Sequence, residues 1–231
     1  MSKIPGFLAR AAGLSLFAAL SFLAARPAMA ETQRLPPPVV DARASGQTET
    51  AVLAGGCFWG VQGVFQHVEG VSAAVSGYAG GGATTAHYMT VGRGDTGHAE
   101  AVRLTYDPQK ISYGKILQIF LSVVHDPTER DRQGPDVGAQ YRSAIFPMTA
   151  EQERVAKAYV AQIDRAHVFA GPIATSIEAG KGFYPAEAYH QDFLTNNPDN
   201  AYVAINDLPK LEALKRNFPE VYREKPELVA Q

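Results

Sequence analysis

The chain has 231 residues, of which 46 % are hydrophobic, with a formal net charge of −2 at pH 7 and a single cysteine. A mildly acidic chain has no electrostatic reason to bind nucleic acid or anionic lipid, so we expect neither partner. One cysteine excludes a disulfide within the chain. The six histidines form no H-x-x-H or H-E-x-x-H pair, so we expect no metal site.

Residues 1–30 have the three parts of a secretory signal peptide. Lys3 and Arg10 supply a positive start without any acidic residue, an apolar run follows at 11–25, and the segment ends in Ala-Met-Ala at 28–30. We therefore expect export, to the periplasm, with cleavage after this motif. An uncleaved membrane anchor is the alternative, although the apolar run is shorter than the about 20 residues that a membrane span requires.

The remaining chain is expected to hold one domain. Residues 31–49 are rich in proline and in polar and charged residues, which is typical of a flexible leader. The catalytic domain is predicted to run from 50 to 219, and residues 220–231 to form a C-terminal tail. The chain shows no internal repeat and no second apolar span.

The single cysteine, Cys57, lies at a predicted strand–helix junction. A β-branched and apolar run at 50–56 indicates a buried strand that ends in two glycines, and apolar residues recur at helical spacing from 58 to 68. Unpaired N–H groups and the positive end of the dipole at a helix N-terminus lower the pKa of a thiol. Cys57 is therefore a candidate nucleophile with a depressed pKa, whereas a lone cysteine can also be a small buried hydrophobe.

The pattern of the remaining elements predicts a mixed α+β domain. Strands are expected at 70–78, 98–108, 140–148 and 171–179. Helices are expected from Ser112 to Val124, from Thr149 to Ala166, near 185–195 and at 207–217, with Ser112 and Thr149 as N-caps. The long polar loop 125–143 is expected to be functional, because loops of that length inside a compact domain usually are.

Glu100 stands out within the strand 98–108. It shares one face of that strand with Val102 and Leu104, where a charge is costly unless it is paired or neutral. A carboxyl in such surroundings has a raised pKa and can act as an acid near neutrality. The alternative is that Glu100 lies at the strand edge and faces water.

Five motifs together resemble the peptide methionine sulfoxide reductases of the A type. They occur in order over residues 50–217, nearly the whole chain after the predicted signal. The motifs are GGCFWG (55–60), GYAGG (77–81), GDTGHAEAVRLTYDP (94–108), HDPTERDRQGPDVGAQYRSAIF (125–146) and FYPAEAYHQDF (183–193). The resemblance implies a single-domain two-layer α/β sandwich with a mixed sheet and a ferredoxin-like core.

The resemblance also implies an activity and its catalytic residues. Such enzymes reduce the S epimer of methionine sulfoxide, free or in proteins, to methionine and so repair oxidised proteins. Cys57 matches the nucleophile that attacks the sulfoxide sulfur, and Glu100 matches the acid that protonates the departing oxygen.

The same resemblance implies the residues that bind the substrate. Phe58 and Trp59 match the apolar wall that receives the S-methyl group, although both rings could instead belong to the core. Tyr78 and Tyr141 match phenols that hydrogen-bond the oxygen, and Asp136 matches a polar residue that orients the substrate.

One departure from the family concerns recycling. Many relatives carry further cysteines near the C-terminus that resolve the oxidised nucleophile, and the corresponding segment 196–219 has none. We expect Cys57 to become a sulfenic acid that an external thiol reduces. This reductant would be a thioredoxin-like or glutaredoxin-like protein, or glutathione. No bound cofactor and a monomer are expected.

Two readings from other functional classes remain. A Cys–His hydrolase would pair Cys57 with His98, His125 or His190 as base. A non-catalytic protein that binds oxidised methionine segments would not need the Cys57 thiol.

Overall fold

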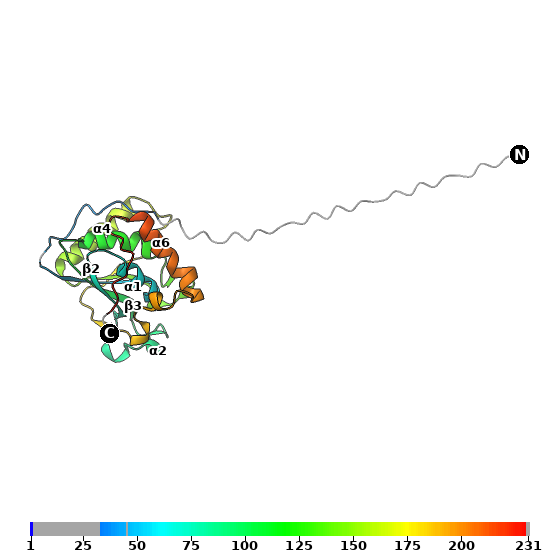
Figure 1. Ribbon diagram of the computed structural model, residues 1–231, viewed down its shortest axis with the longest axis horizontal. Coiled ribbons are helices and arrows are strands. Elements are labelled where there is room, and N and C mark those ends of the chain that lie inside the picture. Colours follow the sequence, from blue (N-terminus) through cyan, green and yellow to red (C-terminus); the bar gives the residue numbers. More distant parts are fainter. Residues whose placement is uncertain (2–32, 45, 230–231) are drawn as a thin grey trace.

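The computed structural model describes residue 1, residues 33–44 and residues 46–229 (Figure 1). The predicted signal peptide and its cleavage site therefore lie outside the described residues, apart from Met1. Within the described part of the chain, none of the helices combines the length and the apolar character needed to cross a membrane.

A six-stranded mixed sheet forms the centre of the molecule. Its strand order is β7-β6-β1-β3-β2-β8, with every pair antiparallel except β6 and β7. The order β6-β1-β3-β2 is that of a ferredoxin-like core, which confirms the predicted α+β class. The strands are β1 (Glu49–Gly55), β2 (Val71–Ala79), β3 (Ala99–Tyr106), β6 (Ser143–Phe146), β7 (Ser176–Ile177) and β8 (Phe183–Pro185).

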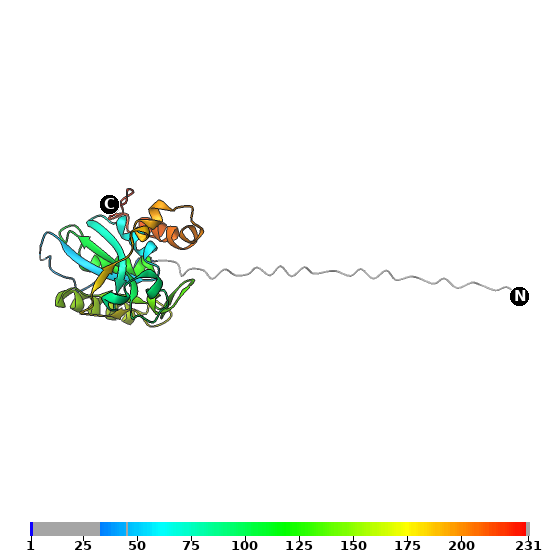
Figure 2. The ribbon, with the colours of Figure 1, turned by 90° about the horizontal axis from the view of Figure 1, so that it is seen from below.

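Helices pack against one face of this sheet and against one another. Helix α1 lies on β2 and β3, α4 packs on α3 and beside β7, and α6 packs on α1 (Figures 1 and 2). Both predicted N-caps are confirmed, because Ser112 and Thr149 accept hydrogen bonds from backbone N–H groups three residues later. The helices are α1 (Phe58–Gln66), α2 (Tyr88–Val91), α3 (Tyr113–Ile119), α4 (Ala150–Arg165), α5 (Phe193–Asn196) and α6 (Leu208–Asn217).

Short irregular elements connect the helices and strands. A two-stranded hairpin is formed by β4 (Arg132–Gln133) and β5 (Asp136–Val137). Three single helical turns are η1 (Ala83–Thr85), η3 (Ala139–Tyr141) and η4 (Ala188–His190). Two π-helical segments adjoin α-helices: η2 (Phe120–Val124) continues α3, and η5 (Val203–Asp207) leads into α6.

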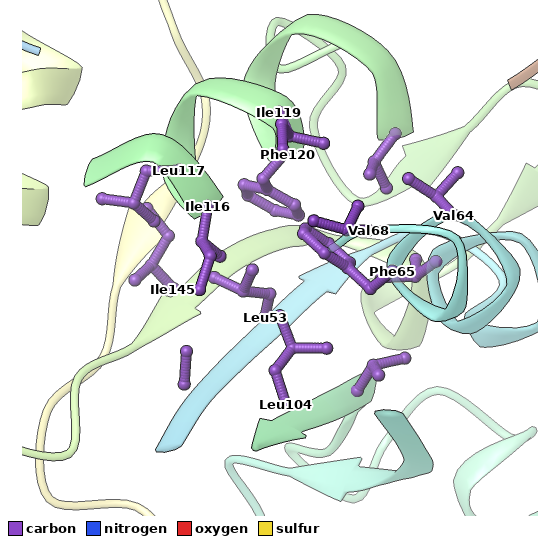
Figure 3. Close-up of a cluster of buried hydrophobic side chains, with 14 of the residues drawn as sticks. Leu53, Val64, Phe65, Val68, Leu104, Ile116, Leu117, Ile119, Phe120 and Ile145 are labelled. Carbon is purple, nitrogen blue, oxygen red and sulfur yellow. The ribbon is translucent and has the colours of Figure 1, made fainter. Parts of the chain in front are cut away.

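The main core lies between the sheet and the helices. Alternate residues of the strands, such as Leu53 and Leu104, meet the apolar face of α1 and the residues of α3 (Figure 3). The opposite face of the sheet carries a smaller cluster, rich in alanine, with Phe183 packed against it. Burial of the α1 face holds the N-terminus of that helix, and with it Cys57, firmly against the sheet.

Two element predictions near the C-terminus are corrected. The strand expected at 171–179 is reduced to Ser176–Ile177, and the helix expected near 185–195 is not formed. In its place β8 pairs with β2, followed by the turn η4 and the short α5. Asp192 has a φ of 58°, and a left-handed residue cannot continue a right-handed helix.

The described part of segment 31–49 is docked on the domain, so the prediction of a flexible leader is wrong there. Leu35 is buried, and its carbonyl accepts a hydrogen bond of 2.6 Å from the side chain of Gln118. Asp41 accepts hydrogen bonds at the N-terminus of α3. Prolines 36–38 restrict the unfolded chain, which lowers the entropy lost when this extended segment packs.

The described part of the predicted C-terminal tail also contacts the domain. Tyr222 forms an isolated β-bridge with Val68, and the N–H of Arg223 donates to the carbonyl of His67 at 2.9 Å. These bonds satisfy backbone groups beyond the end of α1, so the tail caps that helix.

Candidate active site

Cys57 occupies the N-cap of α1, two residues after β1 ends at Gly55. Its neighbour Gly56 has a φ of +86°, and a Cβ there would come within 2.7 Å of the side chain of Gln133. Only glycine allows both the turn and this close approach of the loop 125–143. Cys57 is 9 % exposed, so the thiol is largely buried rather than on the surface.

Glu100 lies beside the same helix terminus. It is 4 % exposed, and its Oε2 accepts a hydrogen bond of 3.0 Å from the backbone N–H of Phe58. Burial raises the pKa of Glu100 to about 8, with the Phe58 N–H opposing and the charge of Asp136 adding to the rise. The prediction of a buried carboxyl on the helix-facing side of its strand is confirmed, and the water-facing alternative is wrong.

The pKa of the Cys57 thiol is raised, whereas the sequence predicted a lowered value. Burial, followed by the carboxyls of Glu100 and Asp207, raises this pKa well above its usual value. The helix terminus does act as expected, because the Trp59 N–H lowers the pKa, as does the ammonium of Lys210. Desolvation outweighs both, so the resting cysteine is a neutral thiol.

Two phenols accompany the thiol and the carboxyl. Tyr141, from η3, and Tyr88, from α2, each have a pKa raised first by burial and then by the nearby charge of Glu100, with Cys57 also contributing. Both phenols therefore stay protonated and can donate a hydrogen bond. Tyr141 was predicted, whereas Tyr88 lies between two motifs in a segment without periodicity, so only the fold identifies it.

Tyr78 lies opposite Glu100 on the neighbouring strand, but its hydroxyl is engaged with another carboxyl. Its hydroxyl donates a 2.8 Å hydrogen bond to Oε2 of Glu187. The other carboxyl oxygen of Glu187 accepts from the backbone N–H of Tyr88 at 3.0 Å. The structure thus directs the Tyr78 hydrogen towards Glu187, and this pair anchors the helix that carries Tyr88.

The two rings after Cys57 play different parts. Phe58 is 1 % exposed and packs against Tyr78 and His190, so most of its ring belongs to the core. Trp59 is partly buried, stacks on Phe193 with ring centroids 3.7 Å apart, and donates from Nε1 to His190 Nδ1 at 3.2 Å. These contacts fix the Trp59 ring while part of its surface remains open to a ligand.

Asp136 reaches the site from the hairpin in the loop 125–143. Its carboxylate accepts a hydrogen bond from the hydroxyl of Tyr202, and the ring of Tyr202 meets Trp59 edge-on at 6.0 Å. Tyr202 was missed in the sequence, because nothing in its surroundings distinguishes it from other tyrosines. The long polar loop thus brings Asp136 and Tyr141 to the site, as its length suggested.

The three candidate histidine bases are engaged with other groups. His98 accepts from the N–H of Gly81, and His190 accepts from Trp59. His125 lies 2.6 Å from the hydroxyl of Ser143, and burial lowers its pKa to about 3. Within the described residues no histidine hydrogen-bonds Cys57, which weighs against a Cys–His hydrolase. In that same part of the chain, no cluster of three or more His, Cys, Asp or Glu side chains could hold a metal ion.

Known proteins resemble this chain in sequence. A sequence model of the family described as peptide methionine sulfoxide reductase matches residues 49–222. Peptide methionine sulfoxide reductase MsrA 2 of Mesorhizobium japonicum is 58 % identical over 190 residues, which are 82 % of this chain and 97 % of that protein. The MsrA 2 of Synechocystis sp. is 49 % identical over 190 residues, covering 80 % and 89 % of the two chains.

Solved structures support the same assignment. Reduced Mxr1 from Saccharomyces cerevisiae superposes with a TM-score of 0.60 at 32 % identity, covering 67 % of this chain and 88 % of the other. Methionine sulfoxide reductase A of Corynebacterium diphtheriae gives a TM-score of 0.56 at 32 % identity, covering 72 % and 85 %. The chain therefore belongs to the peptide methionine sulfoxide reductase family of oxidoreductases, as its five motifs predicted.

Proposed function

We propose that the protein reduces the S epimer of methionine sulfoxide, free and in proteins, with Cys57 as nucleophile and Glu100 as general acid. The observation that carries this proposal is the pairing of a buried thiol with a buried carboxyl at one helix N-terminus. With a pKa of about 8, Glu100 is mostly protonated at pH 7 and can donate a proton.

The reaction balances without an external proton. Glu100 protonates the sulfoxide oxygen while the Cys57 sulfur attacks the sulfoxide sulfur and loses its own proton. The protonated oxygen then moves from the substrate sulfur to the Cys57 sulfur as the S–O bond and the transient S–S bond break. Cys57 becomes a sulfenic acid, the thioether leaves as methionine, and Glu100 regains the thiol proton. Sulfur of the substrate is reduced by two electrons, and the sulfur of Cys57 is oxidised by two.

The raised pKa of the Cys57 thiol fits this scheme. Burial disfavours a lone thiolate, so the thiol loses its proton only as positive charge develops on the polarised sulfoxide. Tyr88 and Tyr141 stay protonated and donate hydrogen bonds to the sulfoxide oxygen. Trp59 receives the methyl group, and Asp136 with Tyr202 orients the rest of the substrate.

Recycling needs a thiol from outside the chain. Cys57 is the single cysteine, so no internal disulfide can form after the first step. An external thiol attacks the sulfenic acid, releases water and forms a mixed disulfide, which a second thiol then breaks. The predicted export of the chain favours a thioredoxin-like or glutaredoxin-like donor in the periplasm, with the enzyme acting as a monomer.

The test uses purified enzyme with the separate R and S epimers of methionine sulfoxide and dithiothreitol as reductant. The S epimer alone should be consumed, and Cys57→Ser should show no turnover. Equal use of both epimers, or turnover by Cys57→Ser, would overturn the proposal.

A second measurement isolates the recycling step. Without reductant, excess S epimer should yield one methionine per chain, and mass spectrometry should find Cys57 as a sulfenic acid that dimedone traps. Release of two methionines per chain would contradict the single-cysteine scheme.

A further inference from the structure

A buried ion pair lies against the first turn of α1. Asp207, at the end of η5, is 0 % exposed, and Lys210, in the first turn of α6, is 8 % exposed. Their Oδ1 and Nζ atoms are 3.1 Å apart. Removing two charges from water is expensive, and a buried pair is often no more stable than apolar residues of the same volume. Stability alone therefore does not explain this ion pair.

The contact with α1 is direct. A Cβ at Gly60 would clash with Oδ1 of Asp207 and stand 2.7 Å from Nζ of Lys210. Gly60 is the third residue of α1, and the side chain of an N-cap residue lies over the N–H groups of the second and third residues. The ion pair thus lies against the turn that carries the Cys57 thiol.

The second carboxylate oxygen of Asp207 is unusual. Oδ2 is buried and has no hydrogen-bond partner among the described residues. A fully satisfied structural ion pair would use this oxygen, because an unpaired buried acceptor is costly. The carboxylate is held by the ammonium on one side only, which leaves its remaining charge to act on the surroundings.

We propose that the Asp207–Lys210 pair is a positioning device for the charge of Cys57, in which the Lys210 ammonium stabilises the thiolate that forms when Cys57 loses its proton, and Asp207 holds that ammonium against Gly60. The proposal rests on the role of Cys57 as nucleophile. The two charges act on the thiol in opposite directions: Asp207 raises the pKa of Cys57, and Lys210 lowers it.

Other titratable groups surround the pair. Glu100 faces Cys57 from β3, and Asp136 faces Asp207 from β5. Burial raises the pKa of the neighbouring phenols and lowers that of the neighbouring histidine, so these groups are uncharged at pH 7. The phenols are Tyr88, Tyr141 and Tyr202, and the histidine is His125. Burial raises the pKa of Asp207, and the ammonium of Lys210 opposes that rise. Replacing one member of the pair therefore changes the local charge in a defined direction.

The test measures the rate of Cys57 alkylation by iodoacetamide between pH 6 and 10. Cys57 is the single cysteine, so the reaction reports one thiol and needs no sulfoxide. Lys210→Met, which nearly keeps the length of the side chain, should slow alkylation about tenfold at pH 7, because the thiol pKa rises when the ammonium is lost. Asp207→Asn leaves the ammonium without a counter-charge and should accelerate alkylation by a similar factor. The double variant should return towards the wild-type rate.

The opposite signs separate this role from structural damage. Loss of packing would move both single variants in one direction, and that result would overturn the proposal, as would an unchanged pH profile in both. If Lys210→Met does not fold, Asp207→Asn and the double variant decide the matter by the same signs. Lys115→Met serves as the matched control, because Lys115, on α3, pairs with Glu220 outside the site, and its loss should leave alkylation unchanged.

Turnover of the sulfoxide gives a second readout. Lys210→Met should lower kcat with little effect on KM, because the ammonium acts on the sulfur rather than on the substrate. A wild-type enzyme that alkylates as expected but reduces no sulfoxide would refute the proposed function and leave the ion-pair effect intact.

Discussion

The two halves of the site are built in different ways. The reacting groups, Cys57 and Glu100, come from α1 and β3, which are held by the sheet and the main core. The surrounding groups come from Trp59 of α1, from Tyr88 of α2, and from the loop 125–143 and the segment 183–207, where side-chain hydrogen bonds and ring contacts hold the chain. Regular elements therefore position the chemistry, and mostly irregular segments complete the environment around it.

The largest loss of activity is expected from changes in the half built on regular elements. Glu100→Gln should lower kcat by about two to four orders of magnitude, because the amide cannot donate a proton to the oxygen. Wild-type kcat should also fall as pH rises through about 8, where Glu100 loses its proton. Both are measured by turnover of the S epimer. Glu69→Gln, at an exposed position beyond α1, is the control and should be unaffected. A wild-type rate for Glu100→Gln at pH 7 would remove Glu100 from its role.

Removing a phenol hydroxyl should give a smaller loss of kcat. These variants also decide between Tyr78, which the sequence resemblance favours, and Tyr88, which the structure favours. Tyr88→Phe and Tyr141→Phe should each lower kcat about fivefold to tenfold, the scale of one lost hydrogen bond, and the double variant should lose more. Tyr78→Phe should lower the melting temperature, because Glu187 loses a hydrogen-bond donor, with a smaller effect on kcat. If Tyr78→Phe impaired kcat more than Tyr88→Phe, the assignment of the two residues would have to be exchanged.

Trp59, on α1, stacks on Phe193 of the surrounding half and tests the contact with the methyl group. Trp59→Ala should raise KM for small methyl sulfoxides about tenfold, because the apolar surface that contacts the methyl group is removed. Trp59→Phe keeps a ring against Phe193 and should be milder. An unchanged KM in Trp59→Ala, measured with the S epimer, would mean that the ring serves the core alone.

The smallest expected effect is on stability, and it depends on pH. The folded pKa of Glu100, about 8, lies above the usual value for glutamate, so its stabilising contribution is full below that usual value and is lost as pH rises through 8. Glu100→Gln has no charge to bury and should melt at a higher temperature than wild type at pH 9. At pH 4 to 5 the difference should shrink or disappear. Calorimetry at both pH values checks this, and a constant difference would show that Glu100 is not desolvated.

Several features of the molecule were determined by local sequence. The junction at Gly55, Gly56 and Cys57 and the caps at Ser112 and Thr149 depend on backbone conformation over a few residues. The placement of Glu100 on the buried face follows from the two-residue period of its strand. The five motifs were enough to indicate the family and the ferredoxin-like core, because they preserve the order and spacing of these same elements.

Other features were decided only by the tertiary structure. The pKa of Cys57 is raised because desolvation and remote carboxyls outweigh the local helix terminus, and burial depends on how distant segments pack. Tyr202, and the preference for Tyr88 over Tyr78, depend on contacts between residues far apart in the chain. The proline-rich segment that contains Leu35 packs because the folded helices offer it a surface, which no property of that segment alone could indicate.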